Sequence, residues 1–373
     1  MIWLDSSSTT PVDPDVRTAM DGWLSGRCGN PSSLHGPGVA AAAAVSDAGR
    51  EVASLVGGDR WDVIFTSGGT EANALAVLGT VRGGRRARVV VSAIEHPSVL
   101  GNAARLADAG ADLVKIRPGP DGRVDPGLLA AAVDGSTRLV SLMHGQNEIG
   151  TIQPIAEAAT AAKARNPDVV FHVDAVQTAG RLPLASALAA VDMVTVSSHK
   201  IHGPMGVGAL LVRKGARRPA PLYTGGEQQA GARPGTENVP GIVGFGVAAR
   251  LAAAAAAAYA GRMDPLVRAF LDALGESDSF GPWPGSAARI PGHLAIVVRG
   301  TPAQPVLHAM EARGFVVSSG SACHSHSKAR SAVLDAVDLP AGSEVIRVVA
   351  CRWTTAEEMA SAGAALREVL LGI

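Results

Sequence analysis

Cysteine is scarce in this sequence, and neither sign of charge is in excess. Only three cysteines occur in 373 residues, far apart at Cys28, Cys323 and Cys351. This spacing excludes a disulfide framework and a cysteine-rich metal cluster, so we expect reduced thiols and no resident metal. Lys plus Arg and Asp plus Glu each number 33. Without a basic excess or a basic stripe, we expect no direct nucleic-acid binding.

Long apolar runs are missing as well. The first ten residues, MIWLDSSSTT, have neither a basic start nor an apolar stretch, so we expect no signal peptide. The alanine-rich segment 251–260 is too short and too weakly apolar to predict a membrane span. With 47% hydrophobic residues, the chain is large enough to bury a substantial core. We therefore expect a cytoplasmic protein with two domains.

Short β-branched segments alternate with alanine-rich helical patterns from about residue 40 to residue 250. Apolar strands separated by helices predict an α/β fold with a mostly parallel sheet that helices cover on both faces. The expected strands are 62–67, 87–93, 137–144, 169–175, 192–198 and 208–213.

The pattern changes after the alanine-rich segment. Strands are expected at 293–300, 314–320 and 344–350, followed by a terminal helix over 355–372. This predicts a smaller α+β C-terminal domain that the N-terminal segment joins. We place the large domain at 12–258 and the small domain at 1–11 and 259–373.

Polar clusters follow several predicted strands, at the edge of the sheet where α/β folds bind ligands. Lys200 in SSHKIHGP can form a Schiff base if its amine is partly unprotonated. Asp174 in VDAVQT can keep a pyridine nitrogen protonated, although a helix N-cap explains it equally well. The turn at Gly69 and Thr70 opens a helix, which suits a phosphate. His96 can stack on an aromatic ring and exchange protons near neutral pH as a catalytic residue, although a lone histidine is more often a surface residue.

Together these clusters resemble the fold-type I pyridoxal-phosphate enzymes, and within them the cysteine desulfurases of the class V aminotransferase group. The resemblance runs nearly end to end and implies a seven-stranded sheet in the large domain. The segments that carry it are LDSSSTTPVDP, GNPSSLHGPG, FTSGGTEANALAV, EHPSVL, QNEIGTIQPI, HVDAVQTAG, SSHKIHGPMGVGALLVR, GGEQQAGARPGTEN, SSGSAC and IRVVACRWTT.

The resemblance implies a role for each matching residue. Lys200 would bind pyridoxal 5'-phosphate covalently, Asp174 would pair with the pyridine nitrogen, and Gln177 would donate to the ring hydroxyl. Thr236 would reach the phosphate of a neighbouring subunit, which implies a homodimer. The implied cofactor-binding residues are Gly69, Thr70, His96, Asn147, Asp174, Gln177, Ser197, Ser198, His199, Lys200 and Thr236.

The resemblance also explains a lone cysteine in a Ser- and Gly-rich segment. Substrate L-cysteine, held by Asn147 and by Arg347 on its carboxylate, would give L-alanine, with its sulfur left on Cys323 as a persulfide. The length of the segment after Cys323 matches the long-loop subgroup. Cys323 could also be a transient ligand of an iron–sulfur cluster.

Several positions depart from the family pattern. Ser198 replaces a usual glycine, Ser6 a usual asparagine, and Gln146 an asparagine found in many relatives. We expect Ser198 to fit if its backbone has a negative φ. The roles of His324 and His326 stay open.

Three other interpretations remain. A selenocysteine lyase uses similar chemistry, a class V aminotransferase would have no use for Cys323, and a scaffold without catalysis would only bind a partner. The sulfur acceptor is not identified by the sequence; iron–sulfur assembly, tRNA thiolation, DNA phosphorothioation and other thio-cofactor pathways all use such enzymes.

Overall fold

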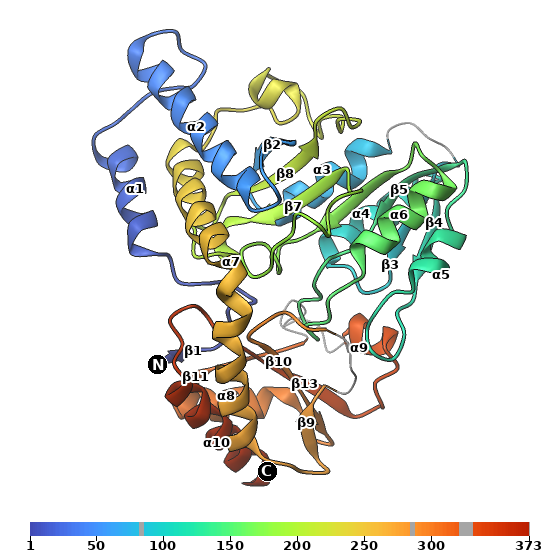
Figure 1. Cartoon of the computed structure of the whole chain (residues 1–373), viewed down its shortest axis with the longest axis vertical. Helices are drawn as coiled ribbons and strands as arrows, with labels where there is room; N and C mark the ends of the chain where they lie inside the picture. Colours follow the sequence, from blue (N-terminus) through green and yellow to red (C-terminus); the bar gives the residue numbers. More distant parts are fainter. Residues whose placement is uncertain (82–85, 284–287, 321–330, 373) are drawn as a thin grey trace.

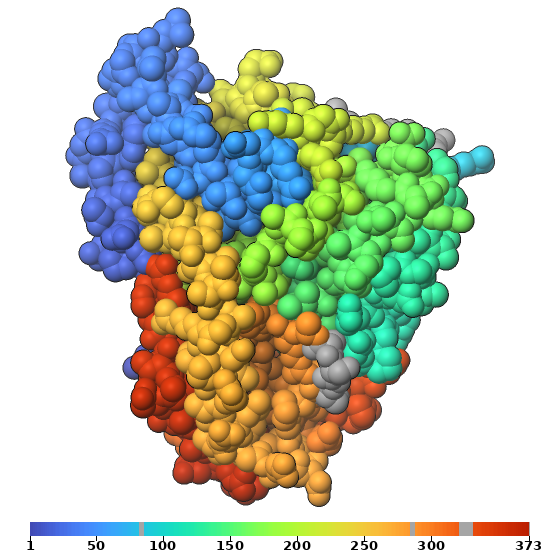
Figure 2. Space-filling model, in the orientation of Figure 1, coloured from blue at the N-terminus to red at the C-terminus, as the bar shows by residue number. Residues whose placement is uncertain are grey.

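The computed structural model describes residues 1–81, 86–283, 288–320 and 331–372. Within these ranges the chain forms two bodies, each built around its own sheet (Figure 1). The space-filling view shows the body of the C-terminal residues packed directly beneath the larger one (Figure 2).

The larger body contains a sheet of seven described strands in the order β2-β8-β7-β6-β5-β3-β4. Its neighbours pair in parallel except where β8 meets β2 and β7, so only β8 runs in the opposite direction. The predicted α/β fold with a mostly parallel seven-stranded sheet is confirmed. The strands are β2 (Trp61–Thr66), β3 (Arg88–Ser92), β4 (Asp112–Ile116), β5 (Thr137–Ser141), β6 (Val170–Asp174), β7 (Met193–Ser197) and β8 (Gly208–Arg213).

Neighbouring residues on a strand point to opposite faces, and helices bury both sets of side chains. Val140 and Phe171 pack against one helical layer, whereas Leu139 and Val170 pack against the other. This arrangement explains why the central strands read as continuous apolar runs. The first layer comprises α2 (Gly36–Ser54), α5 (Pro126–Ala131), α6 (Ile155–Arg165) and α7 (Val239–Leu274), and the second α3 (Gly69–Thr80) and α4 (Pro97–Asp108).

The edge strand β4 is absent from the expected strands. It pairs only with β3, and its residues are exposed or half-buried, with Asp112 and Lys115 facing solvent. An edge strand with charged residues lacks the apolar run that identifies the central strands. The other strands of this sheet occur where they were expected, with ends shifted by up to three residues.

Several helices begin with a polar N-cap followed by proline, which supplies an acceptor and a fixed φ at the first turn. Oδ1 of Asp13 accepts from Asp15 N–H at 2.8 Å and starts α1 (Pro14–Ser25). His96 caps α4 in the same way. This local rule places His96 at the end of the loop that follows β3.

The smaller body contains the sheet β12-β13-β10-β9, whose described pairs are antiparallel. One face packs on the second half of α7, on α8 (Ala303–Ala312) and on α10 (Ala356–Gly372), with Ile296 and Val348 in the core. Two short 3-10 helices of the larger body are η1 (Ser198–Lys200) and η2 (Gln228–Gly231). The remaining elements are β1 (Ile2–Trp3), β9 (Phe280–Pro282), β10 (His293–Arg299), α8 (Ala303–Ala312), β11 (Phe315–Val316), β12 (Ser318–Ser319), α9 (Ala332–Ala336), β13 (Ser343–Val349) and α10 (Ala356–Gly372).

The N-terminal segment belongs to this smaller body. β1 pairs in parallel with β11, and Leu4 is fully buried in the same core as Ile296. The domain limits proposed from the sequence stay a prediction, and they place the change of domain inside α7. Figure 1 shows α7 running from the larger body into the smaller one.

The other face of the small sheet meets the large body. Ala295, Val297 and Val345 pack in one cluster with Ile94 and Ile149 of the large body. Ile94 follows β3 and Ile149 follows β5, so this cluster brings the small sheet to the strand ends of the main sheet.

Among the described helices, α7 is long and apolar enough by length and composition to cross a membrane. It packs against α1 and α2 in the large body and against α10 in the small one. Core helices of folded proteins pass the same test, so α7 is weak evidence for a membrane span.

Close packing of α7 and α10 gives a stability prediction. A Cβ added at Gly363 would lie 2.3 Å from the carbonyl oxygen of Phe270, so Gly363→Ala should force the helices apart and destabilise the fold by about 1–3 kcal/mol. The matched control is Gly261→Ala in α7, where a Cβ meets nothing within 4 Å. The control should be neutral or stabilising by up to about 1 kcal/mol. Urea denaturation measures both; equal stability of the two variants would contradict this packing.

Candidate active site

The residues proposed from the sequence gather in a cavity of about 370 Å³ at the carboxyl ends of the main-sheet strands. Ligands of α/β sheets bind at this edge. Apart from Ser198 and Thr236, every described member of the predicted set lines the cavity. These residues are Gly69, Thr70, His96, Asn147, Asp174, Gln177, Ser197, His199, Lys200 and Arg347.

Lys200 ends η1, directly after β7, and its amine contacts the N-terminal segment. Nζ donates to the backbone carbonyls of Ser7 at 2.5 Å and Ser8 at 2.6 Å. A second tie joins the same two segments, because the hydroxyl of Thr10 donates to the carbonyl of His199 at 2.9 Å. The lysine is thus positioned jointly by the main sheet and by residues almost two hundred positions earlier.

Asp174 ends β6 and uses both carboxylate oxygens. Oδ1 accepts from the N–H of Val176 at 3.0 Å, the local bond that a capping residue makes. Oδ2 accepts from Nδ2 of Asn73 at 2.7 Å, and Asn73 also donates to Oγ of Ser98 at 2.9 Å. Oγ of Ser98 in turn contacts Nδ1 of His96 at 2.7 Å. The carboxylate and the imidazole therefore belong to one hydrogen-bonded network.

The hydrogen bonds of His96 define its protonation. Nδ1 accepts from the backbone N–H of Ser98 at 3.1 Å, so this nitrogen carries no proton. Burial lowers the pKa of His96 below its usual value; the Asp174 carboxylate opposes this shift and Lys200 adds to it. At neutral pH the ring is therefore neutral, with its proton on Nε2.

The cavity fits pyridoxal phosphate on three observations. A Cβ on Gly69 would come within 3.1 Å of Val176, so glycine leaves room beside the first turn of α3, whose N–H groups suit a phosphate. Asp174 supplies an acceptor for a protonated ring nitrogen. Gln177 donates through Nε2 to the carbonyl of Ser7 at 2.9 Å, while its buried Oε1 has no hydrogen-bond partner among the described residues. Gln177 thus keeps one polar atom of its amide for a ring hydroxyl, and its role as a donor to that hydroxyl stays a prediction.

Arg347 reaches the cavity from β13 of the small sheet and is held in place by four groups. Nη1 donates to the carbonyl of Asn147 at 3.0 Å. Nη2 donates to Oδ1 of Asp5 at 3.1 Å, to Oγ of Ser8 at 2.8 Å and to Oγ of Ser318 at 3.1 Å. Its buried Nε has no partner among the described residues. The guanidinium is oriented and keeps a donor for a further carboxylate.

Ser198 and Thr236 do not line this cavity. Ser198 has no positive φ, as its replacement of glycine requires, and its hydroxyl occupies space that a Cβ on Gly203 would need, 2.0 Å away. Thr236 lines a separate cavity of about 190 Å³ together with Arg233 and Asn238. The phosphate contact expected for Thr236 is therefore not made in the cavity that Lys200 lines, and it stays a prediction.

Cys323, His324 and His326 lie outside the described residues. The described residues that flank them are Gly320 and Ser331. Across the described part of the chain, no group of three or more His, Cys, Asp or Glu residues could hold a metal ion.

Sequence reasoning missed Ser7, Ser8, Asn73 and Ser98, which also line the cavity. Asn73 lies one helical turn after Gly69, and Ser98 lies two residues after His96. Both positions could have been found by following the helices that begin at the strand ends. Ser7 and Ser8 carry no such signal, because their place depends on how the N-terminal segment crosses between the bodies.

Comparisons with known proteins agree with this geometry. The class-V aminotransferase family model matches residues 2–361. A cysteine desulfurase from Nostoc sp. is 38% identical over 364 residues, covering 95% of this chain and 89% of the relative. A solved NifS-like protein has a TM-score of 0.90 at 30% identity, covering 100% of both chains. The structure of SspA in complex with cysteine has a TM-score of 0.81 at 28% identity, covering 95% of this chain and 100% of the other.

A buried carboxyl group beside His96 makes the stability of the fold depend on pH. Oε1 of Glu95 accepts from Oγ of Ser92 and from the N–H of Met143, both at 2.7 Å. Complete burial raises the pKa of Glu95 from 4.5 to about 8, although these two hydrogen bonds oppose the shift. The folded protein therefore holds a proton that the unfolded chain releases above its ordinary pKa.

We expect the free energy of unfolding to decrease as pH rises from about 4.5 to about 8, and Glu95→Gln to remove this part of the dependence. The glutamine keeps the shape and carries no ionisable proton. Between pH 5 and pH 8, wild type should lose roughly 2–4 kcal/mol more than the variant in urea denaturation. Parallel pH profiles for the two proteins would show that Glu95 is ionised in the fold.

Proposed function

This chain belongs to the class-V aminotransferase family, and we propose that it is a pyridoxal-phosphate-dependent cysteine desulfurase. It converts L-cysteine to L-alanine and transfers the sulfur to Cys323 as a persulfide. The observation that carries the proposal is the meeting of Lys200, Asp174 and Arg347 in one cavity. Their groups suit an aldehyde, a protonated ring nitrogen and an amino-acid carboxylate, respectively.

Pyridoxal phosphate, when bound, draws electrons from the α-carbon of an amino acid and weakens the bonds around it. We infer that Lys200 holds the cofactor covalently, that Asp174 keeps the ring nitrogen protonated, and that neutral His96 packs against the ring. The phosphate is assigned to groups at the start of α3 and the end of β7, namely Gly69, Thr70, Ser197 and His199.

Proton transfer is assigned to Nζ of Lys200. Once released by the substrate, this amine takes up the α-proton, and the carbonyls of Ser7 and Ser8 stabilise the ammonium that results. Arg347 binds the substrate carboxylate. Its contact with the carbonyl of Asn147 fixes the guanidinium before substrate arrives.

Sulfur transfer is assigned to the thiolate of Cys323. It attacks the sulfur of the substrate, a sulfur–sulfur bond forms, and the carbon–sulfur bond breaks. The electron pair of that bond stays with the substrate carbon, which takes up a proton to become the methyl group of alanine. The products are alanine and a protein persulfide. The proposal also gives a use to a cysteine that a class V aminotransferase would not need.

Replacing the nucleophile tests this function. Cys323→Ser should abolish persulfide formation and lower alanine release from L-cysteine by about a hundredfold or more, while the visible absorption of the bound cofactor persists. Lys200→Ala should lose the lysine-linked absorption band as well. The control is Cys28→Ser, a small change at a thiol that lines the groove between α1, α2 and α7 and not the active-site cavity, and it should retain activity.

Mass spectrometry of the Cys323 peptide after reaction with labelled cysteine gives the decisive measurement. A label on Cys323 supports the desulfurase. Formation of a keto acid without persulfide would indicate an aminotransferase, a strong preference for selenocysteine would indicate the lyase, and a protein that takes up no cofactor would indicate a scaffold.

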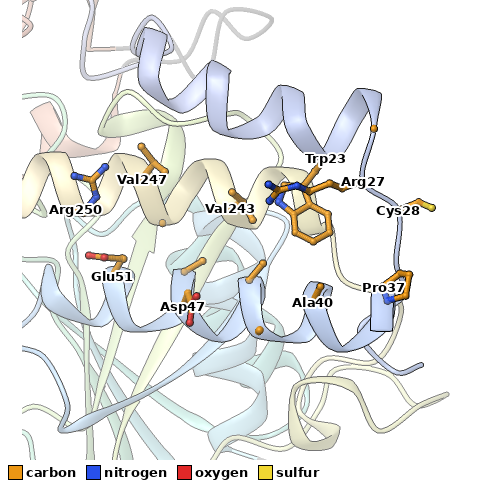
Figure 3. A pocket seen from close by; sticks show the side chains of 15 residues that line it. Trp23, Arg27, Cys28, Pro37, Ala40, Asp47, Glu51, Val243, Val247 and Arg250 are labelled. Carbon is orange, nitrogen blue, oxygen red and sulfur yellow. The ribbon is translucent and has the colours of Figure 1, made fainter. Parts of the chain in front are cut away.

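We further propose that the protein works as a homodimer in which Thr236 serves the neighbouring active site. Support comes from a groove of about 850 Å³ that α1, α2 and α7 line, with Trp23, Ala40 and Val247 among its side chains (Figure 3). Close by in the sequence, just before α2, Leu34 is 97% exposed. A second copy of the chain would cover such apolar surface.

Mixed dimers test this assembly. Lys200→Ala and Thr236→Ala homodimers should each be impaired when cofactor is limiting, but exchange of subunits creates one intact site per mixed dimer. After random exchange, activity should recover to about a quarter of wild type. Mixing that restores no activity, or a monomer in sedimentation, would contradict the shared site.

The cellular location and the sulfur acceptor are also proposals. We place the reaction in the cytoplasm and assign the persulfide sulfur to an acceptor protein rather than directly to a nucleic acid, because the chain has no net charge. The pathway that the acceptor serves is open.

A further inference from the structure

The buried carboxyl group of Glu148 meets both ends of the segment that carries Cys323. Residues 321–330 join Gly320 to Ser331. Oγ of Ser331 donates to Oε2 of Glu148 at 2.6 Å. A Cβ built on Gly320 would lie only 2.7 Å from the same oxygen, so the backbone of Gly320 packs directly on this carboxyl group. A single oxygen atom therefore contacts the points where the segment begins and ends.

The hydrogen bond from Ser331 has a defined direction. Ser331 is the N-cap of α9, and its Oγ accepts from the N–H of Val333 at 3.1 Å. The hydroxyl proton is thereby free to point at Glu148. Ser331 is also buried, so loss of its acceptor would leave an unsatisfied polar group. Glu148 therefore stabilises the start of α9.

Gly320, where the Cys323 segment begins, is held by a backbone hydrogen bond and by close packing. The N–H of Gly320 donates to the carbonyl of Val345 in β13 at 3.2 Å, next to the strand position of Arg347. Any side chain at position 320 would displace the Glu148 carboxyl group. Gly320 has no positive φ, so a larger residue there is disfavoured by this contact with Glu148 and not by the backbone conformation.

Glu148 itself is held by a tight turn that also serves the candidate substrate site. Oε1 of Gln146 accepts from the N–H groups of Glu148 at 2.5 Å and Ile149 at 3.0 Å. Gln146 thus shapes the turn and does not line the cavity. The residue between them, Asn147, points its carbonyl at Nη1 of Arg347. One turn therefore contacts both the guanidinium and the two ends of the Cys323 segment.

We propose that Glu148 is a positioning residue for sulfur transfer: its carboxyl group sets where the Cys323 segment leaves and rejoins the fold relative to Arg347. The proposal rests on the desulfurase function proposed above. It assigns Glu148 no contact with substrate or cofactor. A misplaced anchor shifts the nucleophile and slows its attack, and displacements of about 1 Å can reduce catalysis by up to about a hundredfold.

The first experiment compares Glu148→Ala, Ser331→Ala and Glu148→Gln in the cofactor-loaded, full-length protein. The two alanine variants should lower the rate of persulfide formation on Cys323 by about tenfold, with KM for L-cysteine within about twofold and the cofactor absorption unchanged. Glu148→Gln keeps an acceptor for Ser331 and should remain within about threefold of wild type.

Thiol labelling separates positioning from general damage. The rate of alkylation of Cys323 by iodoacetamide, followed on its peptide by mass spectrometry, should change in the alanine variants. Cys28 lines the groove proposed for the dimer contact and lies far in the sequence from the Glu148 turn, so its labelling rate reports on fold and assembly and should stay constant. A uniform change at both thiols would indicate loss of fold and would overturn the proposal.

A double-mutant cycle tests the contact between Gly320 and Glu148 without relying on Ser331. Gly320→Ala should slow persulfide formation alone, but much less in the Glu148→Ala background, because the steric conflict with Oε2 is then absent. Additive effects would overturn the proposal, as would wild-type rates in Glu148→Ala. Absence of persulfide in the wild-type protein would instead refute the desulfurase function itself, so the two failures are distinguishable.

Discussion

The contact on which the site depends most is the pair of hydrogen bonds from Nζ of Lys200 to the carbonyls of Ser7 and Ser8. Lys200 belongs to the main sheet, whereas the N-terminal segment is anchored in the smaller body through Leu4 and the pairing of β1 with β11. The two bonds therefore join the bodies at the amine where chemistry is proposed. Ser8 extends the connection, because its hydroxyl also accepts from Arg347.

The turn around Asn147 complements this connection from the opposite side. It follows β5 at the ligand-binding edge, and Ile149 packs against the face of the small sheet that meets the large body. Its backbone carbonyl orients Arg347, and the carboxyl group of Glu148 reaches the residues that flank the Cys323 segment. The same turn therefore positions both the proposed substrate-binding group and the ends of the segment that carries the proposed nucleophile. This arrangement suits a reaction in which a sulfur atom passes from the substrate to Cys323.

Much of the architecture was predictable from local pattern. Buried central strands read as apolar runs, and polar clusters marked their carboxyl ends, so Gly69, His96, Asp174 and Lys200 could be proposed together. The edge strand β4 was not predicted, because its residues are exposed or half-buried and it has no continuous apolar run. Asn73 and Ser98 were missed because the prediction stopped at the strand-end clusters and did not follow the helices that begin there.

Family membership, the parallel sheet and the chemistry of the main side chains follow from the order of residues alone, because strand periodicity and strand-end clusters are local properties. Where Ser7, Glu148 and Thr236 lie could not be read in that way. Their positions result from packing between segments one hundred to three hundred residues apart, and a hydrogen bond across such a distance leaves no trace in the neighbouring sequence. The folded chain alone decides that Lys200 contacts Ser7, that Glu148 contacts Ser331, and that Thr236 lies outside the cavity that Lys200 lines.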